Sequence, residues 1–304
     1  MNWEQAQRLL HLRKSAQAKA ARTGGASPRG ESPGLTRATS LCVASGKGGT
    51  GKSITTAALS GRLAQLGRTL LVDADMGIGN AHILQGVSPD RSFVELVAGT
   101  ASPREVVAAC GPGLDLIAAG SGVSKMAELS PFELHRVAEA LEYLETGYDH
   151  LLVDSAAGVS NQTVTLAAAS DLCLLVTTPA VTAMTDAYAF LKVLLRTAPA
   201  AEPVLVVNRA RDEDQARSVV SRMDQVSRRF LGRGPRFLGW VPDDPEVMEA
   251  VNARSSVITH APESEAARAL VRVGEALEVE LARIEARGIG RSLMSRVVHS
   301  PRRI

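Results

Sequence analysis

The stretch "SGKGGTGKS" (45–53) lies between a short aliphatic run, "LCVAS" (41–45), and a segment of helical character, "KSITTAALSGRLAQLG" (52–67). Its glycines, second lysine and final serine have the spacing G-x-x-x-x-G-K-[ST]. A glycine-rich loop in this position lets backbone N–H groups converge on phosphate oxygens, and the N-terminus of the following helix adds positive potential. The stretch therefore predicts a phosphate-binding loop (P-loop) between a strand and a helix of an α/β fold.

The chain on either side of this loop alternates short aliphatic runs with helical segments. Runs without polar alternation are typical of parallel strands buried on both faces of a sheet. The runs are "LCVAS" (41–45), "TLLVDAD" (69–75), "LDLIAAG" (114–120), "HLLVDS" (150–155), "LCLLVTT" (172–178), "PVLVVN" (203–208) and "RFLGWV" (236–241). Segments 52–67 and 132–145 are long enough for crossover helices, and one long helix is expected from Pro262 to about Arg287. The pattern predicts a doubly wound, mostly parallel sheet of about seven strands, with ligands at the carboxyl ends of the strands.

Composition divides the 304 residues into four parts. Residues 1–21 are expected to form a helix, and residues 22–37, rich in Gly, Ser and Pro, are expected to be a flexible linker. The α/β domain occupies 38–287. The last part, 288–304, is basic and has apolar residues at helical spacing, which predicts a weak, reversible membrane contact through residues 291–304.

The net charge of +2 is unevenly distributed. Residues 1–38 contain seven Lys or Arg against two Glu, and residues 287–304 contain five Arg and no acid. The part between them is therefore acidic, which argues against general nucleic-acid binding and favours an anionic surface or acidic partner for the two ends. No apolar run is long enough to span a bilayer. We therefore expect a cytoplasmic protein with reversible peripheral association with the inner face of the cell membrane.

The cysteines and histidines indicate neither a disulfide framework nor a metal site. The three cysteines have no CxxC spacing, and Cys42 and Cys173 fall inside apolar runs, where we expect them to be core residues of a protein from a reducing compartment. The six histidines are scattered without metal-ligand spacing.

The P-loop supplies the expected phosphate contacts. Lys52 is expected to reach the β- and γ-phosphates, and the Ser53 hydroxyl is expected to bind Mg²⁺. The residues expected to contact the nucleotide are Gly46, Lys47, Gly48, Gly49, Thr50, Gly51, Lys52, Ser53 and Ile54.

Three acidic residues lie at the ends of two predicted strands. Asp154 has the Walker B position, and we expect it to hold Mg²⁺ through water. Asp75 is the candidate for orienting the attacking water, and Asp73 is expected to support the metal shell. Lys52 and Asp75 are therefore predicted catalytic residues.

Lys47 is not explained by an ordinary P-loop, because Lys52 already provides the phosphate-binding lysine. The segment "KGGTGKS" (47–53) resembles the deviant Walker A motif, KGGxGK[ST], of the MinD/ParA family. The resemblance, which extends over about residues 38–280, implies a MinD-like P-loop NTPase of the SIMIBI class that binds ATP and Mg²⁺. It also implies a homodimer on ATP in which Lys47, a third predicted catalytic residue, reaches the nucleotide of the other subunit, so that hydrolysis depends on dimerisation.

Four further segments resemble motifs of the family. "DADMGIGNAHILQG" (73–86) is similar to the second-strand motif, and "DSAAGVS" (154–160) is similar to Walker B and its switch segment, with Ala156 where relatives usually have Gly or Pro. "VVNRA" (206–210) and "VPDDPEV" (241–247) resemble the two loops beside adenine. The last two resemblances imply that Asn208, Pro242 and Asp243 contact the base.

Two segments resemble the flagellar-number branch of the family, which includes FlhG, FleN and YlxH. These are "VTTPAVTAMTDAYAFLKVL" (176–194) and "EQAQRLL" (4–10), the second similar to a DQAxxLR-like motif with Leu10 in place of its arginine. The resemblance implies regulation of flagellar number and placement, with an FlhF-type GTPase bound through residues 2–13. Flagellar switch proteins or a flagellar transcription activator are further implied partners.

Other functions suit the sequence less well. The nearest is a cell-division or partition ATPase of the same fold, although a DNA-binding partition protein needs a basic dimer surface and this domain is acidic. A nitrogenase-like reductase needs cluster-binding cysteines in loops, and only Cys110 is a candidate. A scaffold without turnover does not need all four of Lys47, Lys52, Asp75 and Asp154.

Overall fold

The structure, a computed structural model, describes residues 38–75, 79–120 and 131–286. The expected N-terminal helix, the linker and the basic C-terminal segment lie outside the described residues. No helix within the described ranges is long and apolar enough to cross a membrane.

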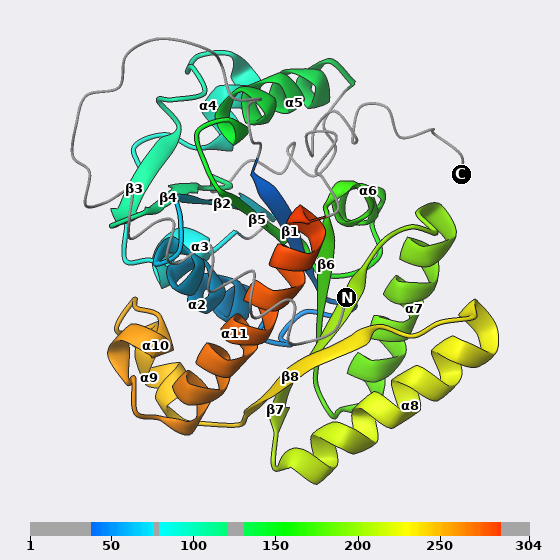
Figure 1. Cartoon of the computed structure of the whole chain (residues 1–304). Coiled ribbons are helices and arrows are strands. Elements are labelled where there is room, and N and C mark those ends of the chain that lie inside the picture. The colour runs from blue at the N-terminus through cyan, green and yellow to red at the C-terminus, as the bar shows by residue number, and fades with distance from the viewer. Residues whose placement is uncertain (1–37, 76–78, 121–130, 287–304) are drawn as a thin grey trace.

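One eight-stranded sheet forms the centre of the molecule, with the strand order β3-β4-β2-β5-β1-β6-β7-β8 (Figure 1). The strands are β1 (Thr39–Ala44), β2 (Thr69–Ala74), β3 (Val107–Gly111), β4 (Leu114–Ile117), β5 (His150–Ser155), β6 (Leu172–Thr177), β7 (Pro203–Ala210) and β8 (Arg236–Pro242). All neighbouring pairs are parallel except β3 and β4. The seven predicted strands are confirmed. The eighth, β3, is a half-exposed edge strand of mostly small residues, "VAACG", and it has no aliphatic run that predicts it.

Helices cover both faces of the sheet (Figure 1). They are α2 (Lys52–Ala64), α3 (Ala81–Leu84), α4 (Phe93–Ala98), α5 (Pro131–Glu145), α6 (Asn161–Ala169), α7 (Val181–Thr197), α8 (Glu213–Leu231), α9 (Glu246–Asn252), α10 (Val257–His260) and α11 (Glu265–Glu285). Because side chains alternate along a strand, Leu41 and Val43 point into the core beneath α2 and α11, while Cys42 and Ala44 point into the core beneath α4 to α8. This double burial explains the continuous apolar runs.

The three cysteines all lie in strands of the sheet, two of them fully buried. Cys42 and Cys173 are register partners on β1 and β6 and are both buried, as predicted. Burial raises the pKa of the Cys42 thiol to about 12. Cys110 lies in β3 and is partly buried, so it is not the loop cysteine that a cluster-binding reductase needs.

The long C-terminal helix begins later than predicted. α11 starts at Glu265, where the Ser264 side chain accepts a hydrogen bond from the backbone N–H of Ala267, while Pro262 lies in the preceding turn. The serine cap therefore sets the start of the helix, because it satisfies an N–H group that has no partner within the helix.

α11 ties the two ends of the described domain together. It packs on α2, where Arg62 and Glu278 form an ion pair of 2.8 Å. Near its end, Glu285 accepts a hydrogen bond of 3.1 Å from the Thr39 hydroxyl at the start of β1. The end of α11 therefore lies beside the amino end of the central strand.

Helix α7 offers a direct test of the packing, because Phe190 is fully buried and Val193, one turn away, is 37% exposed. We expect Phe190→Ala to lower the free energy of unfolding by about 3–5 kcal/mol, since it leaves a cavity in the core. Val193→Ala is the matched control and is expected to change it by no more than about 0.5 kcal/mol. Chemical denaturation measures both, and equal effects of the two variants would contradict the packing of α7.

Candidate functional site

The P-loop joins β1 to α2 at the carboxyl end of the central strand, as the sequence predicts. Gly49 and Gly51 have φ angles of +78° and +84°, which side chains other than glycine rarely adopt. Gly46 has a different reason to be glycine. A Cβ atom there would lie 2.1 Å from the carbonyl carbon of Asp186, so the loop begins in backbone contact with α7.

A cavity of about 400 Å³ opens beside this loop. It runs from the loop to the carboxyl ends of β7 and β8 and to α9. The predicted residues in its wall are Gly48, Gly49, Thr50, Gly51, Lys52, Ser53, Ile54, Asp75, Asn208, Pro242 and Asp243. Four predicted residues do not line it: Gly46, Lys47, Asp73 and Asp154. The structure thus brings the P-loop and both predicted base-side segments to one cavity.

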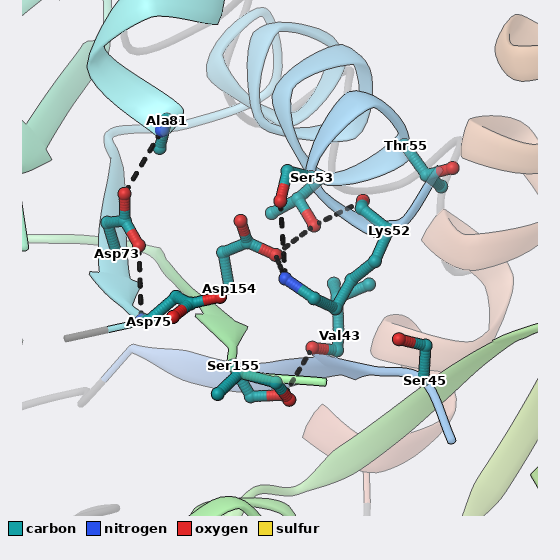
Figure 2. A network of polar contacts seen from close by, with 12 residues as sticks. Val43, Ser45, Lys52, Ser53, Thr55, Asp73, Asp75, Ala81, Asp154 and Ser155 are labelled. Atoms are coloured by element: carbon teal, nitrogen blue, oxygen red, sulfur yellow. Dashed lines mark hydrogen bonds and ion pairs between the residues drawn. The ribbon is translucent and has the colours of Figure 1, made fainter. Parts of the chain in front are cut away.

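A buried ion pair lies at the P-loop end of the cavity. Lys52 Nζ is 2.6 Å from Asp154 Oδ1, and both side chains are almost fully buried (Figure 2). Thr56 donates a hydrogen bond of 3.1 Å to the same oxygen, and Lys52 donates one of 3.2 Å to the Ser53 hydroxyl. The pair joins the first residue of α2 to the end of β5, and each charge compensates the burial of the other.

The second oxygen of Asp154 differs from the first. Oδ2 is buried and has no hydrogen-bond partner among the described residues. The Asp154 carboxylate and the Ser53 hydroxyl both contact Lys52 Nζ. Together they are the kind of donor set that Mg²⁺ accepts, since Mg²⁺ prefers a few protein oxygens with water and phosphate as its other ligands. The chemistry of Ser53 and Asp154 therefore fits Mg²⁺.

Asp73 and Asp75 lie near this pair but have different surroundings. Asp73 is fully buried, and its two carboxylate oxygens accept hydrogen bonds from the backbone N–H groups of Asp75 (3.1 Å) and Ala81 (3.0 Å). Burial, and next the neighbouring Asp154 carboxylate, raise the pKa of Asp73 to about 7. Asp75 is partly exposed and lines the cavity. The metal role of Asp73 and the water-orienting role of Asp75 stay predictions.

Asn208, in β7, is hydrogen-bonded to the P-loop. Its Nδ2 donates a hydrogen bond of 2.8 Å to the Thr50 carbonyl, and a Cβ atom at Gly51 would lie 2.1 Å from that nitrogen. Asn208 lies in the cavity wall, where its predicted contact with a base remains untested. The structure adds a contact that the sequence did not reveal, because backbone acceptors leave no mark on residue spacing.

The far end of the cavity includes residues that the sequence analysis did not name. Arg209, with φ at +57°, forms an ion pair of 3.0 Å with the predicted Asp243. Asp244 accepts backbone hydrogen bonds of 3.0 Å from Glu246 and Ala266, which ties this loop to the start of α11. An acidic residue just ahead of "PEV" is a helix-cap signal that could have identified Asp244.

Apolar side chains complete this end. Val247, Met248 and Leu270 line it, and Met248 is 57% exposed. They reach the cavity through the packing of α9 and α11, which no local pattern predicts.

Lys47 is exposed outside the cavity. Its Nζ donates a hydrogen bond of 3.1 Å to the hydroxyl of Thr182, in the first turn of α7. The two lysines of the P-loop therefore face different surroundings, Lys52 the buried carboxylate and Lys47 the solvent.

Comparisons with known proteins agree with this architecture. A model of the CobQ/CobB/MinD/ParA nucleotide binding domain matches residues 41–257. The antiactivator FleN of Pseudomonas aeruginosa is 31% identical over 239 residues, covering 78% of this chain and 85% of FleN. The flagellum site-determining protein YlxH of Helicobacter pylori is 31% identical over 189 residues, covering 62% of this chain and 64% of YlxH.

Solved structures show the same fold. The septum site-determining protein MinD of Pyrococcus horikoshii, complexed with Mg-ADP, aligns with a TM-score of 0.65 at 23% identity. The alignment covers 79% of this chain and 96% of that protein.

Two glycines of the P-loop allow a matched test of its packing. Gly46→Ala is expected to destabilise the nucleotide-free protein by about 1–3 kcal/mol or more, because the new methyl group would overlap the backbone of α7. A Cβ atom at Gly48 would meet nothing within 4 Å, so Gly48→Ala is expected to change stability by less than about 0.5 kcal/mol. Denaturant unfolding without nucleotide compares them, and similar losses would refute the contact between loop and α7.

The role of Asn208 as a clamp on the P-loop can be separated from a role in base binding. Asn208→Ala leaves the buried Thr50 carbonyl without this donor, so the nucleotide-free protein should lose about 1–3 kcal/mol of stability. Asn252→Ala, at an exposed position of α9, is the control and should be neutral. If Asn208 serves only as a base contact, unfolding without nucleotide will be unchanged.

Proposed function

The chain belongs to the CobQ/CobB/MinD/ParA family of nucleotide-binding domains, and from this premise we propose that it is an ATP-hydrolysing switch that controls flagellar number and placement. The observation that carries the proposal is the contact of Lys52 with Ser53 and Asp154 at one end of a cavity. The other end is lined by the two segments that are predicted to lie beside the base. The first end has the charges and oxygens that a triphosphate and Mg²⁺ need. The second has the mixed apolar and polar wall that suits a nucleobase.

Nucleotide binding requires the residues of the buried pair to exchange partners. Lys52 would leave Asp154 for the β- and γ-phosphates, and Ser53 and Asp154 would hold Mg²⁺. When bound, Mg²⁺ neutralises charge on the phosphate oxygens. At the base end, Asn208, Pro242 and Asp243 line the wall where adenine would lie. The Mg-ADP complex of the Pyrococcus horikoshii protein supports this choice of ligands.

Hydrolysis would follow from the position of Asp75. Its place in the cavity wall, two residues beyond the buried Asp73, suits a carboxylate that orients a water toward the γ-phosphorus. The oxygen of that water bonds to phosphorus while the bond from phosphorus to the β–γ bridging oxygen breaks, giving ADP and inorganic phosphate. Lys52 would stabilise the charge that develops on the phosphate oxygens.

Lys47 would act on the nucleotide of a second copy. Its exposure outside its own cavity supports this role, since a group supplied in trans must be able to leave its own subunit. A cation delivered across a dimer stabilises transition-state charge in the way of an arginine finger. Dimerisation on ATP would then control hydrolysis.

The flagellar role rests on the sequence relatives. The names of the Pseudomonas aeruginosa and Helicobacter pylori proteins, an antiactivator and a flagellum site-determining protein, favour it over a role in cell division. The further partners are proposals from the sequence alone: an FlhF-type GTPase at residues 2–13, flagellar switch proteins or a transcription activator, and a membrane surface at residues 291–304. With these partners, the protein would be cytoplasmic and would attach reversibly to the inner face of the cell membrane.

The test is ATP turnover as a function of protein concentration, with the molecular mass followed by light scattering. The wild type should dimerise on ATP and its specific activity should rise with concentration. Lys47→Ala should lower kcat by at least about 100-fold, as expected for loss of a charge supplied in trans. Asp75→Ala should bind ATP and dimerise, while its kcat falls by at least about 100-fold.

Lys192→Ala removes a lysine from the middle of α7 and is the control, with activity expected within about twofold of the wild type. A wild type that hydrolyses ATP as a monomer, or a Lys47→Ala variant with normal kcat, would remove the dimer switch from the proposal. Absence of ATP binding would overturn the proposal as a whole.

A further inference from the structure

The segment that carries Asp75 is held at both ends by one side chain. It leaves β2 after Ala74 and re-enters described helical structure at α3, which begins at Ala81. Asp73 Oδ1 accepts the hydrogen bond from the N–H of Asp75, and Oδ2 accepts that of Ala81 (Figure 2). A single buried carboxylate therefore spans the start and the end of the segment.

The second contact replaces an ordinary helix cap. Asn80 is the N-cap residue of α3, yet its side chain makes no capping hydrogen bond. Asp73, eight residues earlier, instead accepts from the first N–H of the helix. The start of α3 is thus attached to the end of β2 rather than to its own cap residue.

The chain passes so close to this carboxylate that it leaves no room for a side chain. A Cβ atom at Gly79 would lie 2.5 Å from Asp73 Oδ2 and 2.5 Å from the Cβ atom of Ala119. At Gly79 the chain therefore packs directly on the Asp73 carboxylate, in addition to the two hydrogen bonds.

Asp73 and Asp154 are register partners on β2 and β5, but their oxygens are used differently. Both oxygens of Asp73 accept backbone hydrogen bonds, and Asp73 does not line the cavity. Asp154 has a buried oxygen without a hydrogen-bond partner among the described residues. Of the two adjacent carboxylates, Asp154 is the one with a coordination position to offer.

We propose that Asp73 is a positioning residue that sets the place of Asp75 at the cavity wall, and that it does not support the metal. The inference rests on the proposed function and replaces the metal role that the sequence suggested for Asp73. It makes Asp73 and Asp75 one functional unit, with the first holding the segment and the second facing the substrate.

Asp73→Asn tests this role because an amide has one acceptor oxygen where the carboxylate has two. The NH₂ group must then face an N–H donor, so one end of the segment is released. We expect kcat to fall by about tenfold or more, while the Mg²⁺ concentration at half-saturation and the affinity for ATP stay within about twofold. Asp154→Asn is the comparison and should raise the Mg²⁺ requirement by about tenfold or more.

The double variant decides whether Asp73 acts through Asp75. Once Asp75→Asn has removed the carboxylate, adding Asp73→Asn should lower kcat by less than about twofold further, since residues that act as a unit are not additive. Gly79→Ala perturbs the same contact while keeping the Asp73 carboxylate, and it should lower kcat without changing the Mg²⁺ requirement. The inference would be wrong, and Asp73 would support the metal, if the losses of kcat multiplied in the double variant or if Asp73→Asn raised the Mg²⁺ requirement.

A measurement without nucleotide separates failure of this inference from failure of the proposed function. In the nucleotide-free protein, Asp73→Asn should speed hydrogen exchange of the Asp75 or Ala81 amide by about tenfold or more relative to the buried amides of β1, whose exchange reports global unfolding. This result is expected whether or not the protein hydrolyses ATP. Unchanged exchange at both amides would overturn the positioning role even in an active ATPase.

Discussion

The candidate site depends on one buried ion pair, between Lys52 at the start of α2 and Asp154 at the end of β5. Two charges withdrawn from water are tolerated because each has the other, and removal of either leaves the remaining charge uncompensated. The same constraint shapes binding. A ligand that takes Lys52 must also provide for Asp154, so an anion and a cation bound together suit the site better than an anion alone. A nucleotide with its magnesium ion has this pair of charges.

The P-loop is fixed from outside itself as well as by its own glycines. Asn208, near the end of β7, donates a hydrogen bond to the Thr50 carbonyl of the loop. Gly46, at the start of the loop, packs against the backbone of α7. This hydrogen bond joins the P-loop end of the cavity to the end formed by β7 and β8. The start of the loop, where the exposed Lys47 lies, is joined to a helix on the other face of the sheet. A displacement of α7 would therefore move the start of the P-loop.

The parts of the molecule that could be predicted are those with a local signal. Seven strands were evident because burial on both faces leaves uninterrupted aliphatic runs, and the P-loop was evident because its glycine, lysine and serine spacing follows from phosphate geometry. β3 was missed because a half-exposed edge strand of small residues has neither signal. The partners of Asp73, and Met248 in the cavity wall, were missed because backbone acceptors and packing between distant helices leave no periodicity in the sequence.

The hydrogen bond between Thr39 and Glu285 brings the entry and the exit of the folded domain to one place, at the amino end of β1. The cavity lies at the carboxyl end of the same strand. Two basic segments therefore join the folded domain at neighbouring points. One, before β1, has seven Lys or Arg, and the other, after α11, has five Arg. A surface that bound one of them would then have the other nearby, and two such contacts would together bind more tightly than either alone. Because these points of attachment and the cavity lie at opposite ends of β1, a domain held in this way would be able to keep its cavity open to the solvent.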